Sequence, residues 1–147
     1  MTKTLAGAEL AGRINGVHAN AAPQWDDTDV WIELDSLRDV LRFMKETPDL
    51  DFASLVSISA VDYIEYFEVV YHLRSMRRNH SAVVKTRCYG RSEPTVPSML
   101  DLWRGADLQE REIWDLMGIR FEGHPNMKRI MLWEDFPGHP LRKDYLR

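Results

Sequence analysis

The middle of the chain holds three successive segments in which apolar and polar side chains alternate, and this run constrains the fold more than any other feature. The segments are residues 52–63, 66–73 and 80–89. Alternation with a period of two is typical of a strand with one covered face. The second segment shows it best, with four bulky apolar side chains on one side: Phe67, Val69, Tyr71 and Leu73. Three short strands in succession favour antiparallel pairing, so the sequence predicts an antiparallel sheet that needs a second layer.

Segments with helical spacing lie before and after these strands and can supply that layer. Four helices are expected, over residues 4–17, over 36–50, from Pro97 and Ser98 to an interruption at Gly105, and over 108–117. The capping-box spacings of Ser98 with Asp101 and of Asp107 with Glu110 favour the last two starts. Gly118 is expected to end the final helix in the left-handed conformation. Residues 29–34 are rich in β-forming side chains and predict a further strand.

The last part of the chain, residues 119–147, shows no long periodicity and contains the triplet Gly-His-Pro twice. Its prolines and glycines predict an extended arm that is ordered by contacts, as part of one structural unit with residues 1–118. Cationic residues alternate there with apolar and aromatic ones, including Met131, Trp133 and Phe136. So much apolar surface needs a cover. The pattern leaves open whether the arm wraps its own domain or docks on a partner.

Candidate chemistry in this chain has a structural interpretation in each case. His124 and His139 are far apart in sequence and each precedes proline, which favours turn elements over metal ligands. A single cysteine, Cys88, excludes a cysteine-only zinc or iron–sulfur site within the chain. There is no nucleophile elbow and no glycine-rich phosphate loop. For the three carboxylates of the last helix, we expect Glu110 to cap the helix with Asp107, and Asp115 to pair with Arg111.

Composition narrows the classes of partner. The 147 residues include 44% hydrophobic residues, which suits one folded domain, and the net charge of −4 gives no electrostatic footprint for nucleic acid. No apolar run approaches the ~18 residues of a membrane helix. The first residues contain no secretory signal. The alternatives that remain are a free-standing metalloenzyme that uses His124 and His139, and a nucleic-acid binder that uses residues 74–78 and the arm.

Residues 106–145 closely resemble the signature of the C-type (30 kDa-type) subunit of the respiratory NADH–quinone oxidoreductase, complex I. The core reads E-R-E-x-aromatic-D-L-x-G-I-x-F-x-G-H-P, and the ending reads G-x-P-L-R-K-D-Y. Residues 55–63, 67–75 and 96–103 are similar to the strand and pre-helix segments of the same family, so the resemblance covers nearly the whole chain. Departures are mild: Leu108 stands where the family usually has tryptophan, and residues 126–128 read Asn-Met-Lys in place of Asp-Leu-Arg.

The resemblance implies an α+β fold, a two-layer domain with a mixed, largely antiparallel sheet packed on helices, plus the extended C-terminal arm. It implies a non-catalytic scaffold subunit in the peripheral arm of a proton-translocating complex, on the cytoplasmic side of the cell membrane. No cofactor is expected in this chain; FMN, iron–sulfur clusters and quinone belong to partner subunits. The implied partners are the quinone-site (D-type) subunit and the small iron–sulfur (B-type) subunit. Related modules occur in membrane hydrogenases and in ferredoxin- or F420-linked dehydrogenases.

The same resemblance places the partner interface on the last helix and the arm. If Arg142 and Lys143 meet carboxylates at a largely desolvated interface, Arg142→Ala should cost ~2–5 kcal/mol in assembly, and a location at the rim should cost far less. The predicted interface residues are Glu110, Arg111, Glu112, Asp115, Gly118, Phe121, Gly123, His124, Pro125, Arg129, Gly138, His139, Pro140, Leu141, Arg142, Lys143, Asp144 and Tyr145.

Overall fold

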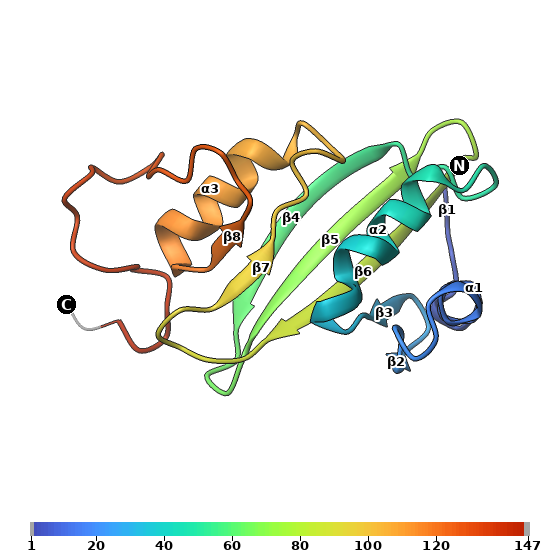
Figure 1. The fold of residues 1–147 in the computed structure, drawn as a ribbon, viewed down its shortest axis with the longest axis horizontal. Helices are drawn as coiled ribbons and strands as arrows, with labels where there is room; N and C mark the ends of the chain where they lie inside the picture. Colours follow the sequence, from blue (N-terminus) through green and yellow to red (C-terminus); the bar gives the residue numbers. More distant parts are fainter. Residues whose placement is uncertain (1, 146–147) are drawn as a thin grey trace.

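The computed structural model describes residues 2–145, and three long antiparallel strands form the centre of its main sheet (Figure 1). These are β4 (Ser54–Asp62), β5 (Phe67–Ser75) and β6 (His80–Cys88). Shorter strands extend the sheet beyond β6. β1 (Lys3–Thr4) and β3 (Asp29–Trp31) both pair with it in parallel, and β2 (Gln24–Trp25) pairs antiparallel with β3. The order β2-β3-β6-β5-β4 is therefore mixed and largely antiparallel, as predicted.

The helices form the second layer. They are α1 (Gly7–Val17), α2 (Leu37–Glu46) and α3 (Ala106–Met117), with a 3-10 turn, η1 (Leu34–Ser36), before α2. In Figure 1, α2 is drawn in front of the sheet and α3 lies along β4. The alternation of β6 shows which face they cover, since Ala82, Val84 and Thr86 are buried while Val83 and Lys85 stay partly exposed. The predicted α+β two-layer fold is confirmed.

A second, two-stranded sheet connects the arm to the domain. β7 (Thr95–Pro97) pairs in parallel with β8 (Arg120–Glu122), which follows directly after α3. Sequence reasoning missed this pair because each strand has only three residues. From Gly123 to Tyr145 the chain has no further helix or strand, and in Figure 1 it loops out beyond α3 and returns towards the sheet.

Two element predictions differ from the structure. The strand expected over residues 29–34 is shorter and ends at Trp31, and the helix expected from Pro97 and Ser98 to Gly105 does not form. Two long-range contacts hold the chain there in turns, because the Ser98 hydroxyl binds Glu110 and Asp101 pairs with Arg38. The capping signal at Ser98 is local, and these distant partners outweigh it.

Candidate docking surface

Asp115 on α3 is the main anchor of the arm. Its side chain is fully buried and accepts a hydrogen bond from Arg129 Nη1 at 2.7 Å. Three successive backbone N–H groups also donate to it, from Ile130, Met131 and Leu132 at 3.1, 2.7 and 2.9 Å. Burial alone would raise the pKa of Asp115, but these donors lower it below its ordinary value. A carboxylate held by a cation and a backbone nest fixes the path of the chain at residues 129–132.

Arg129 extends this anchor to the returning half of the arm. Its Nη2 donates to the carbonyl oxygens of Phe136 and Gly138, both at 2.9 Å. One guanidinium therefore connects α3 to both the outgoing and the returning part of the arm. The predicted pair between Arg111 and Asp115 is wrong. Arg111 instead donates to the carbonyls of Lys128 and Arg129, because the arm supplies Asp115 with a closer cation and three N–H donors.

Arg142 binds the C-terminal end of α3. Its guanidinium donates to the carbonyls of Met117 at 2.6 Å and Arg91 at 2.8 Å, and it lies over the ring of Phe67. Burial lowers its pKa, because removal from water disfavours the charged form of the guanidinium. Gly118 has φ +76, as predicted, and a Cβ there would lie 2.6 Å from the His139 ring. Only glycine permits both this turn and the close approach of the arm.

The last described residues are held by Asp62, at the end of β4. Asp62 accepts both Nη1 and Nη2 of Arg91, at 2.9 and 2.7 Å, and the backbone N–H of Lys143 at 2.9 Å. Bonding to Arg91 lowers the pKa of Asp62 far below its usual range. Arg91 also binds Asp144 at 2.9 Å. Within the described chain, Arg142 meets carbonyl oxygens and Lys143 meets a carboxylate only through its backbone N–H, and contact of either with a partner's carboxylate stays a prediction. Asp62 and Lys143 are 81 residues apart, so no local pattern signals this contact.

The two histidines lie at opposite ends of α3. His124 Nε2 contacts Asp107, 3.3 Å from its carbonyl oxygen and 3.0 Å from Oδ1, while its Nδ1 accepts the Asn126 N–H. His139 Nδ1 lies 3.0 Å from the Asp115 carbonyl, and its ring packs on Trp114. Burial lowers the pKa of His139. Asp107 and Asp115 are separated by roughly 12 Å along the axis at the usual helical rise. The two Gly-His-Pro turns therefore hold the two ends of one helix.

Glu110 is also fully buried, but it does not cap α3. Its carboxylate accepts the Ser98 hydroxyl at 2.6 Å and the Met99 N–H at 2.8 Å, so the capping prediction is wrong. Burial raises its pKa. A serine beside a carboxylate is one half of a nucleophile arrangement. Both groups are enclosed here, and the hydroxyl hydrogen is already used in the loop contact.

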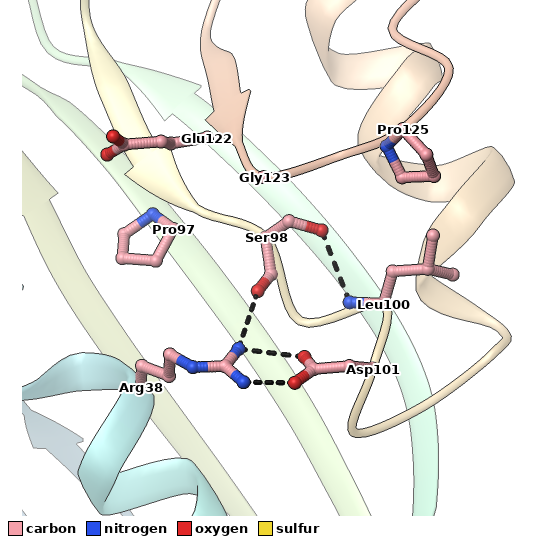
Figure 2. Close-up of a pocket in the computed structure, with 8 residues that line it drawn as sticks. All are labelled: Arg38, Pro97, Ser98, Leu100, Asp101, Glu122, Gly123 and Pro125. Atoms are coloured by element: carbon pink, nitrogen blue, oxygen red, sulfur yellow. Dashed lines mark hydrogen bonds and ion pairs between the residues drawn. The ribbon is translucent and has the colours of Figure 1, made fainter.

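Figure 2 shows a pocket of about 620 Å³ beside the first Gly-His-Pro turn. Arg38 points across it to Asp101 and to the Ser98 carbonyl, so its guanidinium is occupied. Pro97, Gly123 and Pro125 form much of the remaining wall. The pocket is a shaped, mostly apolar surface with an internal ion pair. In residues 2–145, no three His, Cys, Asp or Glu side chains gather closely enough to hold a metal ion.

The arm leaves four large apolar side chains exposed, although it is held closely to its own domain. The exposed fractions are 40% for Ile130, 62% for Met131, 66% for Trp133 and 58% for Leu141. We call these four residues the apolar surface of the arm. Ile130 and Met131 donate their backbone N–H groups to Asp115, and Trp133 follows shortly after them, so α3 holds this part of the backbone in place. Only Leu141 is among the predicted interface residues. Ile130, Met131 and Trp133 are absent from that prediction, although apolar side chains in a Pro- and Gly-rich segment are a sequence signal for a surface that needs a cover.

The predicted interface residues divide by exposure. Buried within the chain are Glu110, Asp115, Gly118 and Phe121. Partly exposed are Arg111, His124, Arg129, His139, Pro140, Arg142 and Tyr145. Exposed are Glu112, Gly123, Pro125, Gly138, Leu141, Lys143 and Asp144. The buried group acts in the chain's own structure, and partner contact through the others stays a prediction.

Comparison with known proteins shows which family this chain resembles. The family model of the respiratory-chain NADH dehydrogenase 30 kDa subunit matches residues 30–147. The second C-type subunit of the NADH-quinone oxidoreductase of Rhizobium meliloti is 39% identical over 140 residues, covering 93% of this chain and 70% of that protein. The fused C/D-type subunit of the same enzyme in Phocaeicola vulgatus is 41% identical over 115 residues, covering 78% of this chain and 22% of that protein.

A solved structure shares the fold. The membrane-bound sulfane sulfur reductase, an archaeal respiratory membrane complex, includes a chain with a TM-score of 0.74 and 30% identity. The match covers 94% of this chain and 84% of that one. The fold and these similarities thus place the chain among α+β subunits of respiratory membrane complexes. The chain belongs to the family of the 30 kDa subunit of respiratory-chain NADH dehydrogenase, which is the C-type subunit family of NADH–quinone oxidoreductase. Within residues 2–145, no helix has the length and apolarity needed to cross a bilayer.

Proposed function

We propose that this chain is a non-catalytic scaffold subunit in the peripheral arm of a proton-translocating NADH–quinone oxidoreductase. In this role it ties a quinone-site subunit of the D type to a small iron–sulfur subunit of the B type, on the cytoplasmic side of the membrane. FMN, iron–sulfur clusters and quinone are held in partner subunits. The observation that carries the proposal is the apolar surface of the arm, displayed on a loop that Asp115 and Arg129 hold in place.

Pre-organisation is the physical reason for this assignment. A free loop of this composition would lose conformational entropy on docking, which weakens binding. Here the loop is already ordered by one buried carboxylate and its donors, so a partner meets a fixed surface. Trp133 and Met131 are of the residue types enriched in interfaces. The C/D fusion in Phocaeicola vulgatus supports the first partner, because fusion requires two domains to work in one assembly.

The test replaces the exposed contacts and leaves the anchor intact. Trp133→Ser combined with Met131→Ser is expected to lower co-purification of this subunit with the complex at least tenfold, by removing contacts of about 2 kcal/mol or more. The matched control is Met76→Ser, at a residue 75% exposed in the β5–β6 turn. Deletion of residues 123–147 should abolish assembly. Normal assembly and quinone reduction in the double variant and in the deletion would reject the proposal.

One observation favours a second candidate. The solved structure with TM-score 0.74 belongs to a sulfane sulfur reductase. This chain could accordingly serve as the equivalent subunit of a membrane-bound hydrogenase or of a ferredoxin- or F420-linked dehydrogenase. The electron donor separates the two. The complex that co-purifies with this chain is expected to reduce quinone with NADH, and activity only with reduced ferredoxin or F420 would select the second candidate.

A further inference from the structure

The sheet face opposite the helices carries a row of aromatic side chains around one arginine. The row runs from the β4–β5 turn past the end of β6 to β3, and we call it the aromatic–arginine patch: Tyr63, Tyr66, Arg87, Tyr89 and Trp31. Tyr66 lies 5.3 Å from Tyr63 and 5.5 Å from Tyr89, measured between ring centroids. The guanidinium carbon of Arg87 lies 5.1 Å from the Tyr66 centroid and 5.7 Å from that of Trp31.

Arg87 is held in position, but its Nε has no hydrogen-bond acceptor. This nitrogen is buried and has no hydrogen-bond partner within residues 2–145, and the carboxylate oxygen it faces, Glu68 Oε2, is 3.8 Å away. That same oxygen accepts the Trp31 indole N–H at 2.9 Å. The neighbouring cation is different, because Lys85 pairs with Asp29 at 2.7 Å. The Nε itself is enclosed, but the Arg87 side chain is 32% exposed, so an external carboxylate would bind through the exposed part of a guanidinium that two rings hold in place.

A pocket of about 340 Å³ opens beside this guanidinium. Its walls include Trp31, Glu33, Arg87 and Tyr89. The volume suits one or two side chains of a docked segment. Tyr89 in its wall is 67% exposed, and Tyr63, farther along the patch beyond Tyr66, is 47% exposed, so exposed aromatic surface continues outside the pocket. Tyrosine, tryptophan and arginine are the residues in which binding energy concentrates at protein interfaces.

We propose that the aromatic–arginine patch is a second docking surface, which takes a segment of a partner protein carrying a carboxylate beside an apolar side chain. The carboxylate binds Arg87 and the apolar side chain enters the pocket. Aromatic rings with arginine also suit single-stranded nucleic acid. Here Glu68 and Asp29 lie on the same face and the chain has a net charge of −4, so the face lacks the cationic track that a nucleic-acid backbone requires. The patch is separate from the arm and does not depend on the function proposed for it.

The experiment places a photo-crosslinking benzoylphenylalanine at Tyr89 in the full chain and irradiates intact cells. The matched control carries the same group at Met76, which is more exposed but lies at the other end of the β5–β6 hairpin. Position 89 is expected to give a cross-link to a protein segment that contains Asp or Glu. The yield should exceed that of position 76 by about fivefold or more, as expected for a specific over a random contact.

Two charge changes test the role of the guanidinium. Arg87→Glu should lower the cross-link yield about tenfold, because like charges then meet at the contact. Arg74→Glu, a charge-matched change at an exposed position of β5, should leave it unchanged. Replacing the cross-linked partner's acid by arginine should restore the yield with Arg87→Glu. Equal yields at positions 89 and 76, no effect of Arg87→Glu, no restoration, or an adduct with nucleic acid would each overturn the proposal. If this chain does not co-purify with an oxidoreductase complex, only the proposed function is rejected. The cross-link at position 89 forms in the cell and does not depend on which complex is present.

Discussion

Glu110 and Asp115 are both fully buried carboxylates on α3, and they are stabilised in opposite ways. Asp115 has one guanidinium and three backbone N–H donors, and its pKa is lowered. Glu110 has one hydroxyl and one N–H donor, and burial raises its pKa. The hydroxyl of Tyr71 is buried without a hydrogen-bond partner in the described residues, and its pKa is raised by burial and then by the charge of Glu110. Two acids on one helix therefore have pKa values shifted in opposite directions.

Asp115 and Glu110 therefore have different structural roles. Asp115 is ionised and carries the arm, so its partners lie beyond the helix at residues 129–132. Glu110 fixes the loop at Ser98 and Met99, inside the domain, with few donors for a charge. Changes at Asp115 should therefore affect the arm and whatever docks on it, whereas changes at Glu110 should affect the domain alone.

The largest effect is expected from Arg129→Met. This change leaves Asp115 buried without its cation, and breaking a buried pair in this way typically costs about 3 to 5 kcal/mol. Because Arg129 also binds the carbonyls of Phe136 and Gly138, the arm should become a target for proteases. Urea unfolding measures the free energy, and limited proteolysis followed by mass spectrometry locates the cuts.

Arg104→Met is the matched control, because Arg104 is exposed and the change removes the same charge. It should alter the free energy of unfolding by less than about 0.5 kcal/mol, as surface substitutions usually do. A loss below about 1 kcal/mol in Arg129→Met, with the arm still protected, would show that the three N–H groups alone hold Asp115.

Asp115→Asn should produce a smaller loss of about 1.5 to 3 kcal/mol, the range for hydrogen bonds to a charged group. The amide keeps the size of the side chain and one acceptor, but it cannot serve three N–H donors and a guanidinium together. The loss should be accompanied by weaker co-purification with the complex, since the surface carrying Met131 is no longer fixed. Unchanged co-purification despite the lost stability would separate the anchor from docking.

The sheet is predictable from the sequence because its signal is local. Alternation in residues 66–73 and the apolar spacing of Leu37, Val40 and Leu41 each report one covered face, and the structure buries those side chains. The helix expected after Pro97 fails for the opposite reason. Ser98 and Asp101 have local capping spacing, but their partners Glu110 and Arg38 lie elsewhere in the chain.

The candidate site is only partly predictable. The apolar and cationic composition of the arm indicates a segment that needs contacts, and the left-handed turn at Gly118 follows from its position after the helix. The contacts themselves do not follow. The helical spacing of Asp115 predicts a pair within its own helix, and Asp62 has the pattern of an ordinary turn residue. Both bind backbone N–H groups of the arm, which every residue except proline carries, so no side-chain pattern reveals them.

Glu110→Gln tests the other side of the comparison and should have the smaller effect on stability. The amide oxygen still accepts the Ser98 hydroxyl or the Met99 N–H, and no charge is lost if the acid is already neutral. The change in free energy of unfolding should stay within about 1 kcal/mol. Protease resistance of the arm should not change. A loss as large as that of Asp115→Asn would mean that Glu110 is ionised in the folded protein.

The smallest and most specific effect is the pH dependence of these two amide variants relative to the unmodified chain. An acid whose pKa is raised on folding stabilises the protein below its unfolded pKa, and this contribution is lost as the pH rises through the folded value. Glu110 is of this kind, so Glu110→Gln should gain stability relative to the unmodified chain as the pH rises above the ordinary range of glutamate. Asp115 has a lowered pKa, so its contribution is complete at neutral pH and is lost as the pH falls through the folded value, below the ordinary range of aspartate. The penalty of Asp115→Asn should therefore stay constant between about pH 5 and about pH 8 and shrink only in stronger acid. Urea midpoints across this range measure both differences, and parallel curves for the two variants would show that the two buried acids are in the same protonation state.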